Sequence, residues 1–162
     1  MPDHEPSIPL ARPRSQRKED VLTRLRQDED LWVATASARD EPCLVPLSFA
    51  WDAQDGLPDR GTLLLCTKRT NPTARNLTPK GEVRLSLGHT RDVVLIDGTA
   101  ELVEGTDLST ASADAFAAKL AWDPRDRPAW VYLRVTPRSV KAWREENELA
   151  ERLLMRDGEW LV

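Results

Sequence analysis

The chain has 162 residues and a formal net charge of −4 at pH 7. This length favours a single domain with its own hydrophobic core. The net negative charge argues against the uniformly basic surface that binds nucleic acid without sequence preference. No apolar run approaches the roughly 20 residues of a membrane span, and the N-terminus lacks the apolar stretch of a signal peptide. We therefore expect a cytoplasmic protein with neither nucleic acid nor a membrane as its partner.

Histidine and cysteine are scarce, at two residues each. Two histidines cannot build a multi-histidine metal site, so no metal is expected, and a Ser-His-Asp scheme lacks a ready base. Cys43 and Cys66 lie in apolar segments, which favours buried free thiols over a disulfide. An enzyme of this composition would take its chemistry from a cofactor.

The N-terminal part of the chain divides near residue 14. Residues 1–14 hold four prolines and show no periodicity, which predicts a flexible arm, and residues 15–162 are expected to form one domain. Ser15 is followed by apolar residues at helical spacing. This pattern predicts a helix that Ser15 caps and that ends near Asp28.

The next segment predicts β-strands. Residues 31–37 and 43–51 flank a polar turn and are typical of an antiparallel pair. Pro46 restricts the second strand to an edge, a bulge or a ligand-facing position, because proline has no N–H for the ladder. A turn-rich loop over residues 52–61 is expected before a third strand at 61–67.

Residues 67–77 read TKRTNPTARNL. Asn71 offers a side-chain oxygen at an N-cap position and Pro72 suits the first helical position, so a short helix is expected here. A helix start exposes unpaired N–H groups, and with Lys68 and Arg69 beside it this segment can bind a phosphate. Solvated charges beside an ordinary cap give the same pattern, so the residues alone leave both interpretations open.

Two more strands follow. Apolar residues alternate over 82–88, and residues 92–104 form a longer strand in which Gly98 is expected to cause a bulge or bend. The spacing over 107–121 predicts a helix with Asp107 as its cap.

A strand is expected at 130–143, with a break at Pro137, and then a short helix, a turn and a last strand. Because short turns join most consecutive strands, the pattern favours a mainly β protein, an antiparallel closed or nearly closed barrel with flanking helices.

The order of six fragments resembles the flavin-binding split-barrel superfamily typified by pyridoxamine 5′-phosphate oxidase. The fragments are WVATAS, LVPLSFAW, LLLCTKRTNPTARNL, EVRLSLG, DVVLIDGTAELVE and VTPRSVKAW. The resemblance covers about residues 15–160. It implies a split β-barrel that forms a homodimer, with FMN or the deazaflavin coenzyme F-420 at the subunit interface. The implied activity is that of a flavin- or deazaflavin-dependent oxidoreductase acting on a small organic molecule. A non-catalytic protein that binds flavin or haem is the alternative.

The resemblance also implies which residues contact the cofactor. Those that would flank the ring are Val45, Pro46, Leu47 and Ser48. Those that would face the phosphate are Thr67, Lys68, Arg69, Thr73, Arg75 and Asn76. Trp143 and Arg152 resemble a tryptophan and an arginine that approach the cofactor from the partner subunit. No catalytic side chain is predicted, because hydride chemistry belongs to the ring.

Two positions depart from the family pattern. Thr73 stands where the family has a phosphate-binding lysine. Either Lys68, Arg69 or Arg75 replaces that charge, or the cofactor is bound weakly or is a different one. Glu148 stands nearest to the arginine that binds the vitamin's phosphate in the oxidase itself. Because a carboxylate would repel that phosphate, pyridoxamine phosphate is not the expected substrate.

Overall fold

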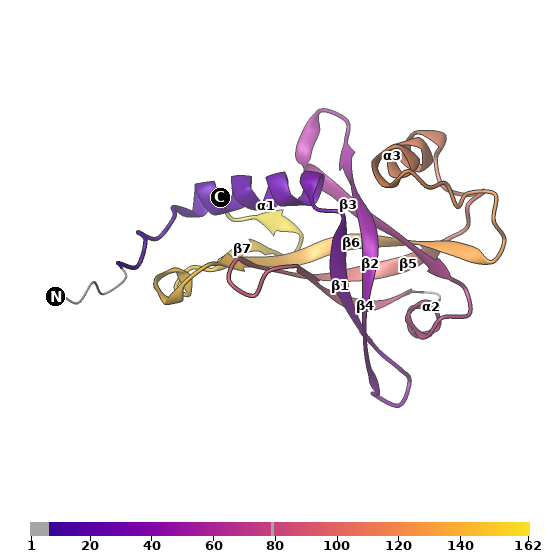
Figure 1. Cartoon of the computed structure of the whole chain (residues 1–162), viewed down its shortest axis with the longest axis horizontal. Helices are drawn as coiled ribbons and strands as arrows, with labels where there is room; N and C mark the ends of the chain where they lie inside the picture. Colours follow the sequence, from indigo (N-terminus) through magenta and orange to yellow (C-terminus); the bar gives the residue numbers. More distant parts are fainter. Residues whose placement is uncertain (1–6, 79) are drawn as a thin grey trace, which may run out of the picture.

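The structure is a computed structural model that describes residues 7–78 and 80–162. Its centre is an antiparallel β-barrel (Figure 1). The barrel strands are β1 (Asp30–Ala36), β2 (Pro42–Gln54), β3 (Leu57–Lys68), β4 (Lys80–Leu87), β5 (Val93–Val103) and β6 (Trp130–Trp143). They follow the order β3-β2-β1-β4-β5-β6, and β6 pairs again with β3, which closes the ring. The expected mainly β, antiparallel barrel is confirmed.

The remaining elements flank the barrel. They are α1 (Arg14–Gln27), α2 (Pro72–Asn76), α3 (Thr110–Leu120), a 3-10 turn (Glu146–Glu148), β7 (Leu153–Arg156) and β8 (Glu159–Trp160). Figure 1 shows α1 and β7 on one side of the barrel and α2 and α3 on the other. None of the helices in the described ranges is both long enough and apolar enough to cross a membrane.

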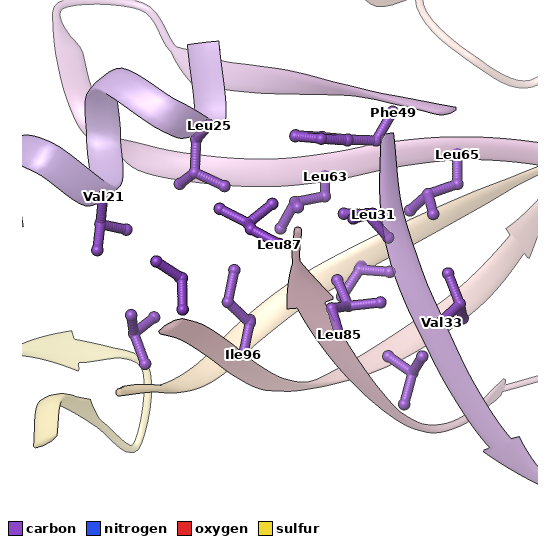
Figure 2. Packing of buried hydrophobic residues seen from close by; sticks show 14 of the residues in the cluster. Val21, Leu25, Leu31, Val33, Phe49, Leu63, Leu65, Leu85, Leu87 and Ile96 are labelled. Atoms are coloured by element: carbon purple, nitrogen blue, oxygen red, sulfur yellow. The ribbon is translucent and has the colours of Figure 1, made fainter. Parts of the chain in front are cut away.

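The main core fills the barrel and extends beneath α1 (Figure 2). Val21 and Leu25 of α1 point toward inward-facing strand residues such as Leu63 and Leu87. Each fully buried aliphatic side chain of this kind contributes about 1.5–3 kcal/mol relative to exposure. A second, smaller cluster lies beneath α3 around Phe116 and includes the opposite face of β3. Both faces of β3 are therefore buried, which accounts for its continuous apolar run.

Two predicted helix caps are wrong. The helix α1 begins at Arg14 after Pro13, and no side chain caps it, so Ser15 lies inside the helix. The helix α3 begins at Thr110, and its cap is Ser109, which accepts a hydrogen bond from the Ser112 N–H at 3.2 Å. Asp107 is not the cap because it lies two residues before Ser109, in the preceding turn, where its N–H donates to the Glu104 carbonyl.

The predicted loop at 52–61 is also wrong. The strands β2 and β3 run through it and meet in a tight turn, where Gly56 adopts a φ of 72°. Only glycine enters this left-handed region without steric cost. Residues 53–58 are exposed, so a polar sequence can form this hairpin without burying polar side chains.

Pro137 does not break β6, contrary to expectation. Gly98 pairs with Pro137 while Asp97 pairs with Ser139, so one extra residue on β6 forms a bulge. The bulge absorbs the register change and leaves the strand continuous. The predicted irregularity at Gly98 is confirmed.

The segment before α1 is attached to the C-terminal part of the chain. Arg12 donates to the Glu148 carboxylate through Nε and Nη2, at 2.9 and 2.7 Å. Asn147 donates to the Pro9 carbonyl at 2.8 Å. Residues 1–6 of the predicted arm lie outside the described residues, and its division from the domain at residue 14 stays a prediction.

Candidate functional site

The barrel splits between β2 and β3. Their ladder starts at the hairpin and ends at the pair Phe49 and Leu65. Beyond this pair β2 continues beside β1 alone, from Ser48 to Pro42, while β3 continues beside β6 from Cys66 onward. The two strands therefore diverge, and each presents an edge that the other does not cover.

A pocket of about 480 Å³ opens at this divergence. Three residues that were predicted to flank a ring line it, namely Pro46, Leu47 and Ser48. Cys66 contributes from β3, and residues 119–122 at the end of α3 form another wall. The pocket thus combines the split in the sheet with the helix that lies over it.

The four predicted ring residues alternate in direction along β2. Val45 and Leu47 pack against the main core, whereas Pro46 and Ser48 are exposed. The Ser48 hydroxyl donates to the Asp30 carboxylate across the strand pair, at 2.6 Å. Pro46 needs no second ladder partner, because it has no N–H and β2 pairs only with β1 at this position.

The predicted phosphate segment folds as a strand end followed by a very short helix. Asn71 is the N-cap of α2 and Pro72 its first residue, as expected. The Asn71 side chain does not cap the helix, however, because its amide donates to the Thr67 hydroxyl at 2.9 Å. Asn76 likewise donates to the Thr35 hydroxyl at 3.0 Å. These bonds hold the polar side chains in fixed positions.

The three predicted substitute cations differ in their surroundings. Arg69 makes two hydrogen bonds to Glu104, at 2.7 and 2.6 Å, which raise the pKa of Arg69 and lower the pKa of Glu104. Lys68 places its ammonium 5.7 Å from the centroid of the Trp130 ring. No carboxylate of the described residues pairs with Lys68 or Arg75, both of which are exposed. Arg69 is therefore the least available of the three for a ligand.

Thr73, at the position of the family lysine, is only 2% exposed. Its short side chain is buried on α2 beside Ala74. Thr73 therefore supplies no positive charge to a ligand phosphate near this helix.

Trp143 and Arg152 lie next to each other but far from the pocket. The Arg152 guanidinium carbon is 5.8 Å from the Trp143 ring centroid. Trp143 ends β6, and Lys68 pairs with Trp130 at the other end of that 14-residue strand. At roughly 3.3 Å per residue the two ends are roughly 40 Å apart. One chain does not bring these groups together, so their predicted contact with the cofactor needs a second subunit.

Glu148 has a structural role that sequence reasoning missed. The carboxylate is 3% exposed and accepts hydrogen bonds from Arg12 and from the Arg144 backbone N–H. The hydrogen bonds from Arg12 lower the pKa of Glu148 to about 2, against the effect of burial. No sequence signal links Arg12 with Glu148, because 136 positions separate them.

Sequence reasoning also missed the α3 wall of the pocket. Lys119 was part of a pattern that predicted only a packed helix. Cys66 is a buried free thiol, as expected, and burial raises its pKa to about 12. Cys43 is free and half-buried. The thiol in the pocket is therefore protonated at neutral pH.

A second hollow of about 850 Å³ is lined by residues of β1, β4, β5, β6 and β7. Arg84, Asp97 and Lys141 are among the residues that line it, and none of the predicted site residues does. No cluster of three potential metal ligands was found in the part of the chain that the structure describes.

An antiparallel barrel that closes through β3 and β6 and opens between β2 and β3 defines a split-barrel protein. Residues 18–144 match the family model described as "Pyridoxamine 5′-phosphate oxidase", and the chain belongs to this family. No curated protein matches the chain at the sequence level.

Solved structures show the same fold. General stress protein 26 from Bacillus anthracis is 17% identical with a TM-score of 0.54, over 77% of this chain and 92% of that chain. A haem-binding protein from Mycobacterium smegmatis is 18% identical with a TM-score of 0.58, over 92% and 60%. An F-420 reductase is 18% identical with a TM-score of 0.55, over 73% and 93%. At these identities the likeness concerns the fold.

Proposed function

We propose that this protein is a homodimeric oxidoreductase that binds FMN, or alternatively coenzyme F-420, and acts on a small organic molecule other than pyridoxamine phosphate. The observation that carries the proposal is the pocket at the split between β2 and β3, where Pro46, Leu47 and Ser48 meet the end of α3. The family match and the F-420 reductase with the same fold support it. A cytoplasmic location stays a prediction from the sequence.

The residues around the split fit a planar cofactor with an anionic tail. The pocket volume of about 480 Å³ is within the usual range for small-molecule sites. Leu47 and Pro46 offer apolar surface, and the edge of β2 beyond Phe49 has no β3 partner, which leaves backbone groups for the rim of a ring. Lys68 and Arg75 supply exposed positive charge. The cofactor would supply hydride chemistry, and these residues would bind and orient it.

The outer face of the β1–β2 pair supports a dimer. Trp32 is 46% exposed and Leu44 is 63% exposed. Trp32 pairs with Pro46, and Leu44 pairs with Ala34, so the four side chains form one apolar surface. Large apolar side chains gathered on an exposed sheet face are typical of an interaction surface. A second copy on this face would lie next to the split.

The decisive experiment is a titration of the purified chain with FMN and with F-420, followed by fluorescence, together with an absorption spectrum of the protein as purified. We expect micromolar or tighter binding of one cofactor. The bound cofactor, reduced anaerobically, should be reoxidised rapidly by an added quinone or enone. A colourless protein that binds neither cofactor would refute the proposal.

The substitution Lys68→Ala tests whether Lys68 binds the phosphate of the cofactor. If Lys68 contacts the phosphate, we expect a loss of about 1.5–3 kcal/mol, the usual contribution of a charged hydrogen bond. Arg69→Ala should cost less, because Arg69 is already bonded to Glu104. Dissociation constants from the same titration measure both effects. Arg156→Ala, at an exposed arginine of β7 on the other side of the barrel from α2 (Figure 1), is the matched control. An unchanged constant for Lys68→Ala would assign Lys68 to solvent.

A non-catalytic binder of flavin or haem is the second candidate. Thr73 in place of the family lysine favours it, as does the haem-binding protein with the same fold. In that case the chain would bind haem, or would hold a reduced flavin that quinones and enones do not reoxidise. Rapid turnover with any of these acceptors would exclude this candidate.

A further inference from the structure

Lys119 is the charged residue of the pocket that the proposed function does not use. It lies in the last turn of α3, half-buried, and lines the pocket with Leu47 and Cys66. Its ammonium is 4.2 Å from the centroid of the Phe49 ring and 3.4 Å from the Leu25 carbonyl oxygen. No carboxylate in the described ranges forms an ion pair with it.

These contacts satisfy Lys119 only in part. An ammonium has three N–H donors, and the Leu25 carbonyl accepts one of them at a long distance. The Phe49 ring face attracts the charge but accepts no ordinary hydrogen bond. Burial lowers the pKa of Lys119, which reflects the incomplete replacement of water around the ammonium. The hydrogen bond from Lys119 to Leu25 joins α3 to α1 and leaves N–H groups of the Lys119 ammonium that can bind a ligand.

The rest of the pocket is suited to the body of a flat organic anion. Its walls include the apolar side chains of Leu47, Phe116 and Trp122. The Cys66 thiol is protonated and does not repel a negative charge. The Ser48 hydroxyl already donates to Asp30, and Lys119 is the charged donor of the lining.

Two acidic residues act on the Lys119 ammonium, Asp28 and Glu29, and Asp28 is already paired with Arg24 at 3.2 Å. Glu29 lines the pocket, and its side chain is exposed at the rim. Its charge is screened by solvent and opposes an anion only weakly. Removing the charge of Glu29 should therefore strengthen the binding of an anion, whereas removing the charge of Lys119 should weaken it.

We propose that the pocket binds a flat aromatic or conjugated organic carboxylate, held by a charge-assisted hydrogen bond from the Lys119 ammonium. This inference rests on the proposed function, because Pro46 and Leu47 would then lie beside both the acid and the cofactor ring. It names the substrate class of that site, a conjugated carboxylic acid small enough to share the pocket of about 480 Å³ with the cofactor ring.

The test compares trans-cinnamate with its neutral isostere cinnamamide on the full chain, with and without cofactor, by isothermal titration calorimetry. We expect cinnamate to bind at least about tenfold more tightly, as one charge-assisted hydrogen bond implies. Lys119→Met should remove this preference and leave cinnamamide binding within about twofold. Glu29→Gln should tighten cinnamate binding about two- to threefold by removing a like charge. Lys141→Met, at a half-buried lysine outside the pocket, should change neither constant.

Folding of the variants is checked by thermal unfolding. If Lys119→Met does not fold, Lys119→Arg should retain the preference for the acid, and the gain from Glu29→Gln still tests the charge. Equal affinity for acid and amide, full cinnamate binding by Lys119→Met, or displacement of cinnamate by bound cofactor would each overturn the inference. The parallel FMN and F-420 titrations separate this outcome from failure of the proposed function, because cofactor affinity does not depend on the cinnamate result.

Discussion

Gly98 shows how a single side chain constrains the barrel. A Cβ atom at this position would lie 2.6 Å from the Thr136 carbonyl oxygen and 3.0 Å from Val135 Cγ1. The first contact is with backbone, which cannot rotate away. Glycine is therefore required where the bulge brings β5 and β6 together.

Gly98→Ala should lower the free energy of unfolding by about 1–3 kcal/mol, the usual cost of overpacking. Gly88→Ala is the matched control, because a Cβ at residue 88 meets nothing within 4 Å. We expect the control to stay within about 0.5 kcal/mol of the wild type. Urea denaturation of the three proteins measures the difference. Equal effects of the two substitutions would contradict the close approach at Gly98.

At the scale of elements, the helix α3 carries one wall of the pocket and its start is set by a hydrogen bond. Ser109 accepts the Ser112 N–H, whereas Asp107 lies in the turn before the helix. The sequence contains two good capping residues close together. Ser109 becomes the cap because the helix begins directly after it, whereas Asp107 still belongs to the preceding turn.

Ser109→Ala should destabilise the protein by about 1 kcal/mol through loss of this cap. Asp107→Ala should change the stability much less, since its side chain caps nothing in α3. The melting temperatures of both variants test the assignment. A larger loss for Asp107→Ala than for Ser109→Ala would restore the cap predicted from the sequence.

The pair Arg12 and Glu148 joins the segment before α1 to the 3-10 turn before β7. Because the pKa of folded Glu148 is about 2, below its ordinary value near 4.5, the ionised carboxylate stabilises the fold above about pH 5. This contribution, about 3 kcal/mol at most, is lost as the pH falls from 5 toward 2.

Glu148→Gln should therefore reduce the free energy of unfolding strongly at pH 7 and much less at pH 2.5. Urea denaturation at both pH values measures the two differences. Glu159→Gln is the control, because it breaks an exposed pair with Arg60 and should matter little at either pH. A Glu148→Gln effect that is the same at both pH values would show that the carboxylate charge is not the source of the stability.

For the whole molecule, the proposed dimer accounts for the apolar face of β1 and β2. Leu44→Glu and Trp32→Glu should each convert the dimer into monomers at micromolar concentration, because a carboxylate would be buried without a partner. Both side chains are exposed in the single chain, so the monomer should stay folded. Sedimentation velocity and circular dichroism measure these two properties. Leu57→Glu, at the β2–β3 turn, is the control, and a Leu44→Glu dimer of unchanged affinity would place the interface elsewhere.

Local patterns in the sequence were sufficient for several elements. Alternating apolar residues indicated β4, and Asn71 with Pro72 indicated the start of α2, because these signals depend on neighbouring residues only. The order of short strands indicated the closed barrel. Resemblance to a family, carried by fragments in a fixed order, indicated the split, and three of the residues that it implied for the ring, Pro46, Leu47 and Ser48, line the pocket.

Contacts between distant residues were decided by the tertiary structure. The end of α3 brings Lys119 over the split, and Arg12 meets Glu148 across nearly the whole chain. Arg69 stays a predicted phosphate residue, but the fold places Glu104 beside it. The physical reason is that a sequence pattern records what one segment can bury or hydrogen-bond by itself, whereas the partner of a charge depends on where the barrel places every other segment.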